Sequence, residues 1–222
     1  VLTDDAIWFI NDANKQDDPF FMYLAFNAPH DPRQAPKKFL DLYPINNIKL
    51  PKNYSPQHPY MREIGNMPGL RDEALAPYPR SEYAVKKHIQ EYYAVISHLD
   101  QQVGKIIDHL ENQEMLDNTY IVFTSDHGLA VGQHGLIGKQ SLYDHSIRVP
   151  MIISGPDIEK GKKISHDIYL QDIVPTTFDL AGIAIPDDID FKSFYPLIKG
   201  IDNQSKHDGI YGTFGCCPPN YF

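Results

Sequence analysis

The chain has 222 residues, a formal net charge of -9, 42% hydrophobic residues and 22% charged residues. This length and composition suit one sizeable α/β domain with its own hydrophobic core. No stretch approaches the roughly 20 consecutive apolar residues of a membrane-spanning helix, and the negative charge argues against a nucleic-acid surface, which would need clustered Lys and Arg.

The first elements expected along the chain are a helix and a strand. Ala6 and Ile10 belong to an apolar stripe at helical spacing near the start of the chain. Residues 20–26, Phe-Phe-Met-Tyr-Leu-Ala-Phe, form a continuous apolar run after a proline. Such a run predicts a strand buried on both faces. The strand should stop at residues 27–32, where two prolines disfavour both a helix and a strand ladder.

The remaining elements alternate between helices and strands. Residues 36–79 lack clear periodicity and predict a long surface excursion with a few short helical turns, which often shapes a binding site. Apolar residues from 81 to 113 recur at three- and four-residue spacing, which predicts a long helix. Residues 119–125 and 150–154 predict two further buried strands, and residues 171–181 a short helix. The predicted fold class is therefore α/β, a layered sandwich with a mostly parallel sheet.

Polar clusters follow two of the predicted strands. Ligands in an open parallel sheet bind beyond the carboxyl ends of the strands. Asp126 and His127 stand side by side at such an end and offer one hard oxygen and one imidazole nitrogen. These two atoms suit a metal ion, but two ligands do not make a site, and an Asp-His-Gly triplet alone is more often a turn.

Two further residues are candidates for holding an anion. Lys139 follows a glycine-punctuated loop that could aim its ammonium at the same strand ends, where a point charge suits an oxyanion. Without context, a solvated surface lysine is the commoner outcome. His30 is held in a defined place between two prolines, although a histidine in such a loop more often serves as a hydrogen-bonding residue than as a catalyst.

Several segments together resemble the sulfatase family of the alkaline-phosphatase superfamily. They are Thr-Ser-Asp-His-Gly at 124–128, Gly-Gln-His-Gly at 132–135 with Lys139, and residues 29–32, 92–100, 148–156 and 172–176. They occur in the right order and spacing over about residues 1–200. The resemblance implies an alkaline-phosphatase/sulfatase-like fold that is incomplete at the N-terminus. Residues 1–200 would be the C-terminal portion of the catalytic domain, and residues 201–222 the truncated start of a smaller C-terminal subdomain.

The resemblance also implies residue roles. Asp126 resembles the strand-end carboxylate ligand of a divalent cation, usually calcium, and His127 stands where the family carries Asn or His as a further ligand. Imidazole is an unusual partner for calcium, which prefers oxygen, so the resemblance implies a divalent cation without fixing which one. Lys139 resembles the lysine that contacts the sulfate oxygens. His30 resembles the histidine that holds the sulfate and the leaving-group side of the ester, and His134 is expected to support the substrate pocket.

One element of the family pattern is missing. A sulfatase nucleophile is a formylglycine made from the Cys or Ser of a C/S-x-P-x-R motif, accompanied by two Asp ligands nearer the N-terminus. Residues 216–220, Cys-Cys-Pro-Pro-Asn, carry Asn in place of Arg, and Asp4 and Asp5 fit a helix start better than a ligand pair. We therefore expect the formylglycine upstream of this chain, which alone would be inactive.

The implied activity is hydrolysis of a small-molecule or carbohydrate sulfate ester by the full-length enzyme. Export to the periplasm, the cell exterior or a lysosome-like compartment is common in the family. A phosphodiesterase or phosphonate monoester hydrolase of the same superfamily is an alternative, as is a non-catalytic binding protein on this fold. A third alternative is a structural turn cluster without metal at residues 126–139. The sequence leaves open the oligomeric state and the choice among sulfated sugars, aryl sulfates and choline-type esters.

Overall fold

A computed structural model describes residues 1–214, which form two compact units. The first contains residues 1–116 and 129–141, and the second contains residues 117–128 and 142–214. His30, His134 and Lys139 therefore belong to the first unit, whereas Asp126 and His127 belong to the second. The Cys-Cys-Pro-Pro-Asn segment lies outside the described residues, and the division expected at residue 200 stays a prediction.

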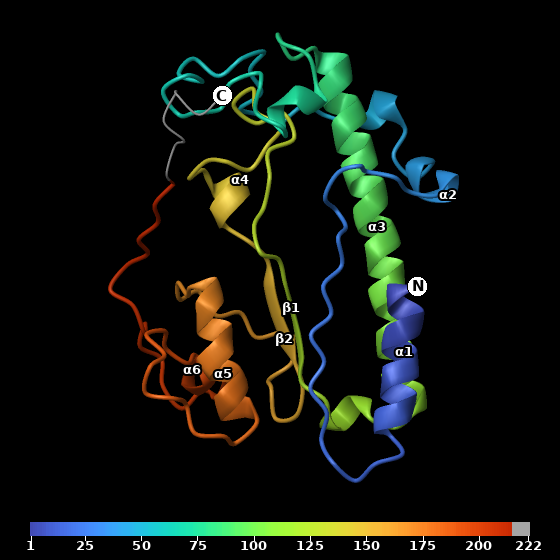
Figure 1. Cartoon of the computed structure of the whole chain (residues 1–222), viewed down its shortest axis with the longest axis vertical. Coiled ribbons are helices and arrows are strands. Elements are labelled where there is room, and N and C mark those ends of the chain that lie inside the picture. The colour runs from blue at the N-terminus through green and yellow to red at the C-terminus, as the bar shows by residue number, and fades with distance from the viewer. Residues whose placement is uncertain (215–222) are drawn as a thin grey trace. The chain divides into compact units, whose positions relative to one another are not determined.

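Two long helices of the first unit match the predictions. The helices α1 (Leu2–Ala13) and α3 (Glu82–Asn112) run side by side in the same direction (Figure 1). Ala6 and Ile10 of α1 are buried. The hydroxyl of Ser81 accepts the backbone N–H of Ala84 at 3.2 Å, which satisfies one of the free donors at the start of α3.

The excursion between these helices contains the short helical turns that the sequence predicts. They are α2 (Lys37–Leu40), η1 (Ile45–Asn47) and η2 (Glu73–Leu75), and η3 (Leu116–Asn118) follows α3. The excursion is not confined to the surface, however. Its residue Ile48 packs in one core cluster with Val85 and Ile89 of α3 and with Val131. The excursion and residues 129–141 are therefore packed into one core with α3.

The second unit contains the only sheet among the described residues. The strands β1 (Ile121–Thr124) and β2 (Met151–Ser154) pair antiparallel, with Ile121 opposite Ser154 and Thr124 opposite Met151. The prediction of parallel pairing is wrong for these two strands. A parallel pair needs a crossover element that packs back across the sheet, but the connection here contains only the four-residue helix α4 (Asp144–Ile147). Within residues 1–214 the structure contains this antiparallel pair and no parallel sheet.

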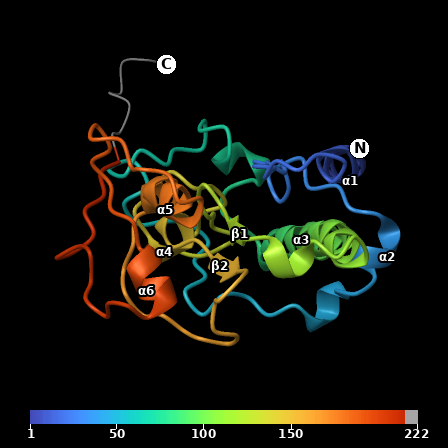
Figure 2. The ribbon, with the colours of Figure 1, turned by 90° about the horizontal axis from the view of Figure 1, so that it is seen from below.

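One face of this strand pair is covered by helices. Ile153 of β2 packs against a buried cluster of Phe194, Leu197 and Ile198, the last two from α6 (Tyr195–Lys199). The helix α5 (Ile173–Leu180), preceded by η4 (Leu170–Asp172), also lies beside the strands in Figures 1 and 2. It confirms the short helix predicted at residues 171–181. Gly182 follows the helix with a φ of 68°, a left-handed conformation that glycine adopts without steric cost.

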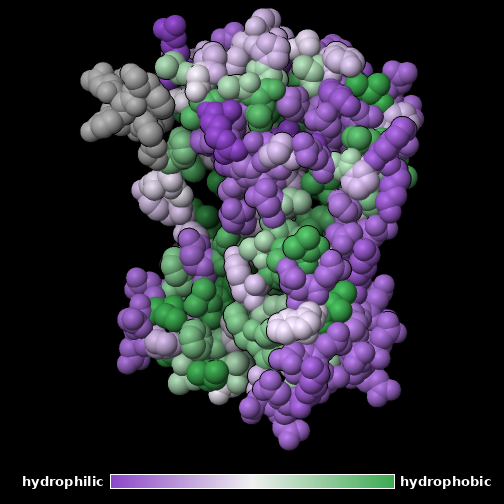
Figure 3. Space-filling view, turned by 45° about the vertical axis from the view of Figure 1, so that its right-hand side comes forward, coloured by the Kyte–Doolittle hydropathy of each residue, from purple (hydrophilic) through white to green (hydrophobic). Residues whose placement is uncertain are grey.

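Residues 20–26 are extended but have no strand partner within the described residues. The prediction of burial on both faces is wrong, because Phe21 is 72% exposed and Tyr23 is 84% exposed. The intervening residues are half-buried, which is the alternation of a single extended segment covered on one side only. Other apolar side chains also reach the surface, and the face in Figure 3 shows several such patches in green.

None of the helices within residues 1–214 is long and apolar enough to cross a membrane.

Candidate functional site

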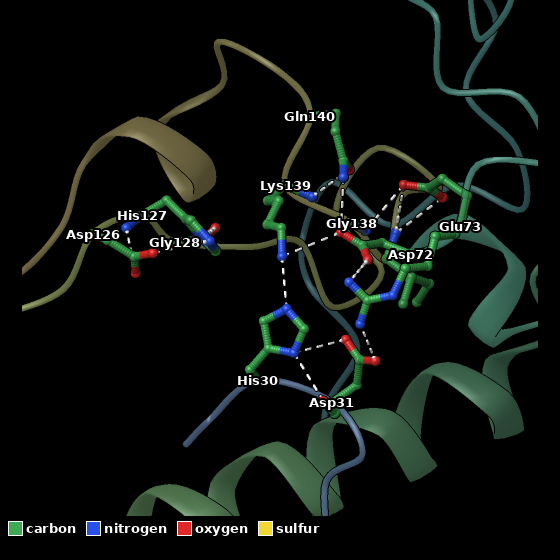
Figure 4. A network of polar contacts seen from close by, with 12 residues as sticks. His30, Asp31, Asp72, Glu73, Asp126, His127, Gly128, Gly138, Lys139 and Gln140 are labelled. Carbon is green, nitrogen blue, oxygen red and sulfur yellow. Dashed lines mark hydrogen bonds and ion pairs between the residues drawn. The ribbon is translucent and has the colours of Figure 1, made fainter. Parts of the chain in front are cut away.

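The structure brings together His30 and Lys139, two of the residues singled out from the sequence. The Lys139 ammonium donates to Nε2 of His30 at 2.9 Å, across 109 residues of sequence (Figure 4). Nδ1 of His30 lies 2.8 Å from the backbone carbonyl of Asp31. Because a carbonyl can only accept and an ammonium can only donate, the two contacts place the ring proton of His30 on Nδ1. The contacts therefore define a neutral imidazole whose Nε2 faces a cation.

The loop that carries His30 is anchored on both sides. The guanidinium of Arg71 donates to Oδ2 of Asp31 at 2.7 Å, next to the ring of His30. Nη1 of Arg33 lies 2.9 Å from Nδ1 of His88 on α3. Burial lowers the pKa of His88, and the charge of Arg33 lowers it further, so this histidine is neutral and accepts from Arg33. The position of His30 is thus fixed by side chains far away in sequence.

Lys139 is held from the other side by Asp72. The Lys139 ammonium lies 3.5 Å from Oδ2 of Asp72, and the amide of Gln140 donates to the same oxygen at 2.8 Å. The Asp72 side chain is only 5% exposed. Burial alone raises the pKa of this carboxyl, but the Gln140 hydrogen bond and the charges of Lys139 and Arg71 together hold its pKa below the ordinary value. Asp72 is therefore an ionised carboxylate next to the Lys139 ammonium.

The neighbouring Glu73 fixes the backbone of the same loop. Its carboxylate accepts the backbone N–H of Gly138 at 2.9 Å and that of Ile137 at 3.2 Å. It also pairs with the guanidinium of Arg80 at 2.5 Å, and both side chains are buried. Burial, together with the Glu73 hydrogen bond, raises the pKa of Tyr78, whose hydroxyl donates to the same carboxylate at 2.8 Å. These contacts tie the backbone of residues 137–138 to a buried ion pair.

His134 lies in the tight turn that precedes this loop. It has a φ of 55°, and its Nε2 accepts from the amide of Asn53 at 2.9 Å. Its ring centroid lies 6.5 Å from that of His58, a buried histidine. These contacts fix the turn against the residue 53–58 segment. The supporting pocket role of His134 stays a prediction.

Asp126 and His127 follow β1 in the second unit. Oδ2 of Asp126 lies 3.4 Å from Nε2 of His127, and Nδ1 of His127 lies 2.9 Å from the carbonyl of Gly128. The N–H of Gly128 donates to Ser146 at 2.8 Å, and a Cβ at this glycine would collide with the carbonyl of His145. The backbone is thus pinned, whereas the Asp126 carboxylate is 84% exposed.

These two residues alone do not make a metal site. No group of three or more His, Cys, Asp or Glu side chains within residues 1–214 is arranged to hold a metal ion. Ca²⁺ takes six to eight oxygen ligands, and Asp126 contributes carboxylate oxygens with an imidazole beside them. The carboxylate suits a divalent cation, but two residues do not complete a coordination sphere.

Comparison with known proteins decides the family. The family described as "Sulfatase" matches residues 1–183. The chain belongs to the sulfatase family. A sulfatase from Formosa agariphila is 32% identical over 216 residues, covering 93% of this chain and 40% of the relative. A choline-sulfatase from Rhizobium meliloti is 34% identical over 191 residues, covering 83% of this chain and 36% of the relative. This sulfatase-family chain thus spans about two-fifths of the length of these relatives.

A solved structure shows the fold shared by this sulfatase-family chain. The phosphonate monoester hydrolase from Silicibacter pomeroyi superposes with a TM-score of 0.76 at 25% identity, over 89% of this chain and 40% of that one. The fold expected from the resemblance, that of the alkaline-phosphatase and sulfatase enzymes, is confirmed at this level.

Sequence reasoning missed the residues that hold His30 and Lys139 in place. These are Asp31, Arg71, Asp72, Glu73, Arg80 and Gln140. The signal that could have found them is the charged triplet Arg71-Asp72-Glu73 in a region otherwise rich in Pro and Tyr. Buried charges must find partners, but the triplet does not show that it is buried.

Proposed function

We propose that this chain is the part of a sulfuric ester hydrolase that holds the sulfate group, and that Lys139 and His30 hold it. The observation that carries this proposal is the 2.9 Å contact between the Lys139 ammonium and Nε2 of His30. A cation and an imidazole that face each other at this distance form a site for an anionic ester with a leaving oxygen. The family membership supplies the chemistry for which such a site is suited.

Each of the two groups has a distinct task. The Lys139 ammonium binds the sulfate oxygens and stabilises the negative charge that grows on them in the transition state. His30 faces the leaving oxygen through Nε2, which protonates it after the Lys139 ammonium has moved from Nε2 to the sulfate oxygens and the ring has taken up a proton from water. The Asp31 carboxylate, 3.3 Å from Nδ1, stabilises the positive charge that the ring carries during this transfer. The nucleophile, a formylglycine, belongs to the segment of the full-length protein that precedes this chain.

We further propose that Asp126 and His127 contribute to a divalent cation site, with calcium as the first candidate. When bound, such a cation supplies charge stabilisation as a Lewis acid. Asp126 offers it an exposed carboxylate, and the contact of Nδ1 of His127 with the Gly128 carbonyl leaves Nε2 of His127 as the nitrogen available for a metal.

Peptide mapping of the native full-length protein by mass spectrometry tests the proposal. A Cys or Ser converted to formylglycine in a C/S-x-P-x-R peptide upstream of Val1 is the expected result. A native protein that carries no such residue would favour a non-catalytic binding protein on this fold.

Substitution of Lys139 tests the assignment of the sulfate contact. Lys139→Met should lower kcat/KM of the full-length protein for 4-nitrophenyl sulfate by about 10²- to 10³-fold, as expected for the loss of one transition-state donor. Lys37→Met is the matched control, because Lys37 is an exposed surface lysine that pairs with Asp41. If kcat/KM is unchanged in Lys139→Met, the assignment of Lys139 to the sulfate contact is wrong.

The structural match to a phosphonate monoester hydrolase favours a second candidate, hydrolysis of phosphonate or phosphate esters. Both reactions use an anionic tetrahedral group, so Lys139 and His30 suit either. The ratio of kcat/KM for 4-nitrophenyl sulfate to that for 4-nitrophenyl phenylphosphonate distinguishes them. A ratio well above one supports the sulfatase, and a ratio well below one supports the phosphonate esterase.

A further inference from the structure

We propose that Asp72 is a positioning residue for the reaction, which fixes the Lys139 ammonium against His30. This inference rests on the proposed function, because Lys139 matters for catalysis only if it holds the sulfate group. None of the segments that carry the family resemblance includes Asp72, and it lies in the excursion at residues 36–79, where the sequence shows no periodicity.

The geometry ties Asp72 to the side chain of Lys139. Oδ2 of Asp72 lies 3.5 Å from the Lys139 ammonium and accepts from Gln140 at 2.8 Å, and the carboxylate is only 5% exposed. Arg71 reaches Oδ1 at 3.4 Å. Lys139 thus has an anion on one side and the lone pair of His30 on the other, which together define one position for its ammonium (Figure 4).

The roles of Asp72 and Glu73 are separable although the two residues are adjacent. Glu73 accepts from the backbone N–H groups of Ile137 and Gly138, so it holds the course of the loop. Asp72 contacts the side chains of Lys139 and Gln140, so it holds the functional group at the end of the loop. Loss of Asp72 should therefore disturb the ammonium more than the backbone.

Asp72 has an electrostatic cost for substrate binding, which makes its role recognisable. A buried carboxylate beside the sulfate site repels an anionic substrate. A variant that only lost stability would instead show weaker anion binding together with a lower kcat. Asp72 should therefore favour the transition state through the position of Lys139 while weakening ground-state binding of the anion.

The variant Asp72→Asn tests this role, because asparagine keeps the shape of the side chain and an acceptor oxygen for Gln140. It should change kcat and the inhibition constant of sulfate in different ways. In the full-length protein, kcat for 4-nitrophenyl sulfate should fall by about tenfold or more, as when other supporting residues are lost. The inhibition constant of inorganic sulfate should stay the same or decrease, because the repelling charge is gone. Asp41→Asn is the matched control, since Asp41 pairs with Lys37 at the surface.

A second measurement on this chain does not depend on activity. The ¹⁵N signal of Nε2 of His30 reports whether the Lys139 ammonium still donates to it. Asp72→Asn should shift this signal toward the value in Lys139→Met, and Asp41→Asn should leave it in place. Both substitutions are read at neutral pH in protein shown to be folded by its amide spectrum.

The outcomes separate the two proposals. If the wild-type protein hydrolyses no sulfate ester, the proposed function fails, while the His30 signal still tests the positioning of Lys139 by Asp72. If Asp72→Asn leaves both kcat and the His30 signal unchanged, or lowers only the melting temperature, the positioning role of Asp72 is overturned.

Discussion

The loop that ends at Lys139 and the strand end that carries Asp126 differ in how their side chains are held. Lys139 contacts His30 and Asp72, which are 109 and 67 residues away in sequence. The contacts of Asp126 are with its immediate neighbours Ser125 and His127. The first arrangement is preorganised by tertiary structure, whereas the second fixes a backbone and leaves the carboxylate in solvent.

This difference fits the two proposed tasks. A group that stabilises transition-state charge must be in place before the reaction, because its reorganisation would otherwise add to the barrier. A metal ligand acts only together with the other ligands, and the ion itself then fixes its position. Substitutions in the two regions should therefore have very different effects on the free energy of unfolding.

The largest effect is expected at Glu73. Glu73→Ala leaves Arg80 buried without its carboxylate partner, so the free energy of unfolding should fall by about 3–5 kcal/mol in urea denaturation. Glu73→Gln retains an acceptor oxygen for the N–H groups of Ile137 and Gly138 and should lose less. Glu159→Ala, at an exposed ion pair with Lys162, is the control and should change stability by less than about 0.5 kcal/mol. A loss below about 1 kcal/mol at Glu73 would mean that the loop is held by other contacts.

The sequence predicts those parts of the structure that leave a local pattern, and it does not predict contacts between distant residues. Periodicity predicts α3, because buried residues such as Val85 and Ile89 recur at helical spacing. The resemblance points to His30 and Lys139, but their contact is tertiary and has no local signal.

The sequence also could not predict the antiparallel pairing of β1 with β2 or the exposure of Tyr23. An apolar run states a preference for burial but does not identify the neighbouring segment that would provide it. Burial of Asp72 likewise depends on partners that are distant in sequence.

A smaller effect, dependent on pH, is expected at His88, which anchors the His30 loop through Arg33. Burial and the Arg33 charge lower the pKa of His88 in the folded state, so the unfolded chain binds this proton more readily. Its contact is therefore fully available above the unfolded pKa of about 6.5. Its contribution decreases as the pH falls below that value, by no more than about 1.4 kcal/mol per pH unit.

The test compares wild type and His88→Gln in urea at pH 8 and at pH 5.5. The variant should be less stable at pH 8, and the difference should narrow at pH 5.5, where wild type has lost part of the contribution. A difference that stays constant between the two pH values would show that His88 does not titrate with unfolding, and the His30 loop would then need another anchor.

The smallest effect on stability is expected at Asp126, and it separates the two regions most clearly. Because the Asp126 carboxylate is exposed and contacts only its neighbours, Asp126→Ala should change the free energy of unfolding without metal by no more than about 0.5 kcal/mol. Asp144→Ala is a matched control, since Asp144 is equally exposed and forms an i,i+4 pair with Arg148. Calcium added to the full-length protein should raise the melting temperature of wild type and of the Asp144 variant but not that of Asp126→Ala, because an ion that binds only the folded state stabilises it.

A metal-free loss above about 1 kcal/mol at Asp126 would show that local contacts hold this strand end as firmly as Glu73 holds the Lys139 loop. An equal calcium response in all three proteins would instead make residues 126–128 a structural turn.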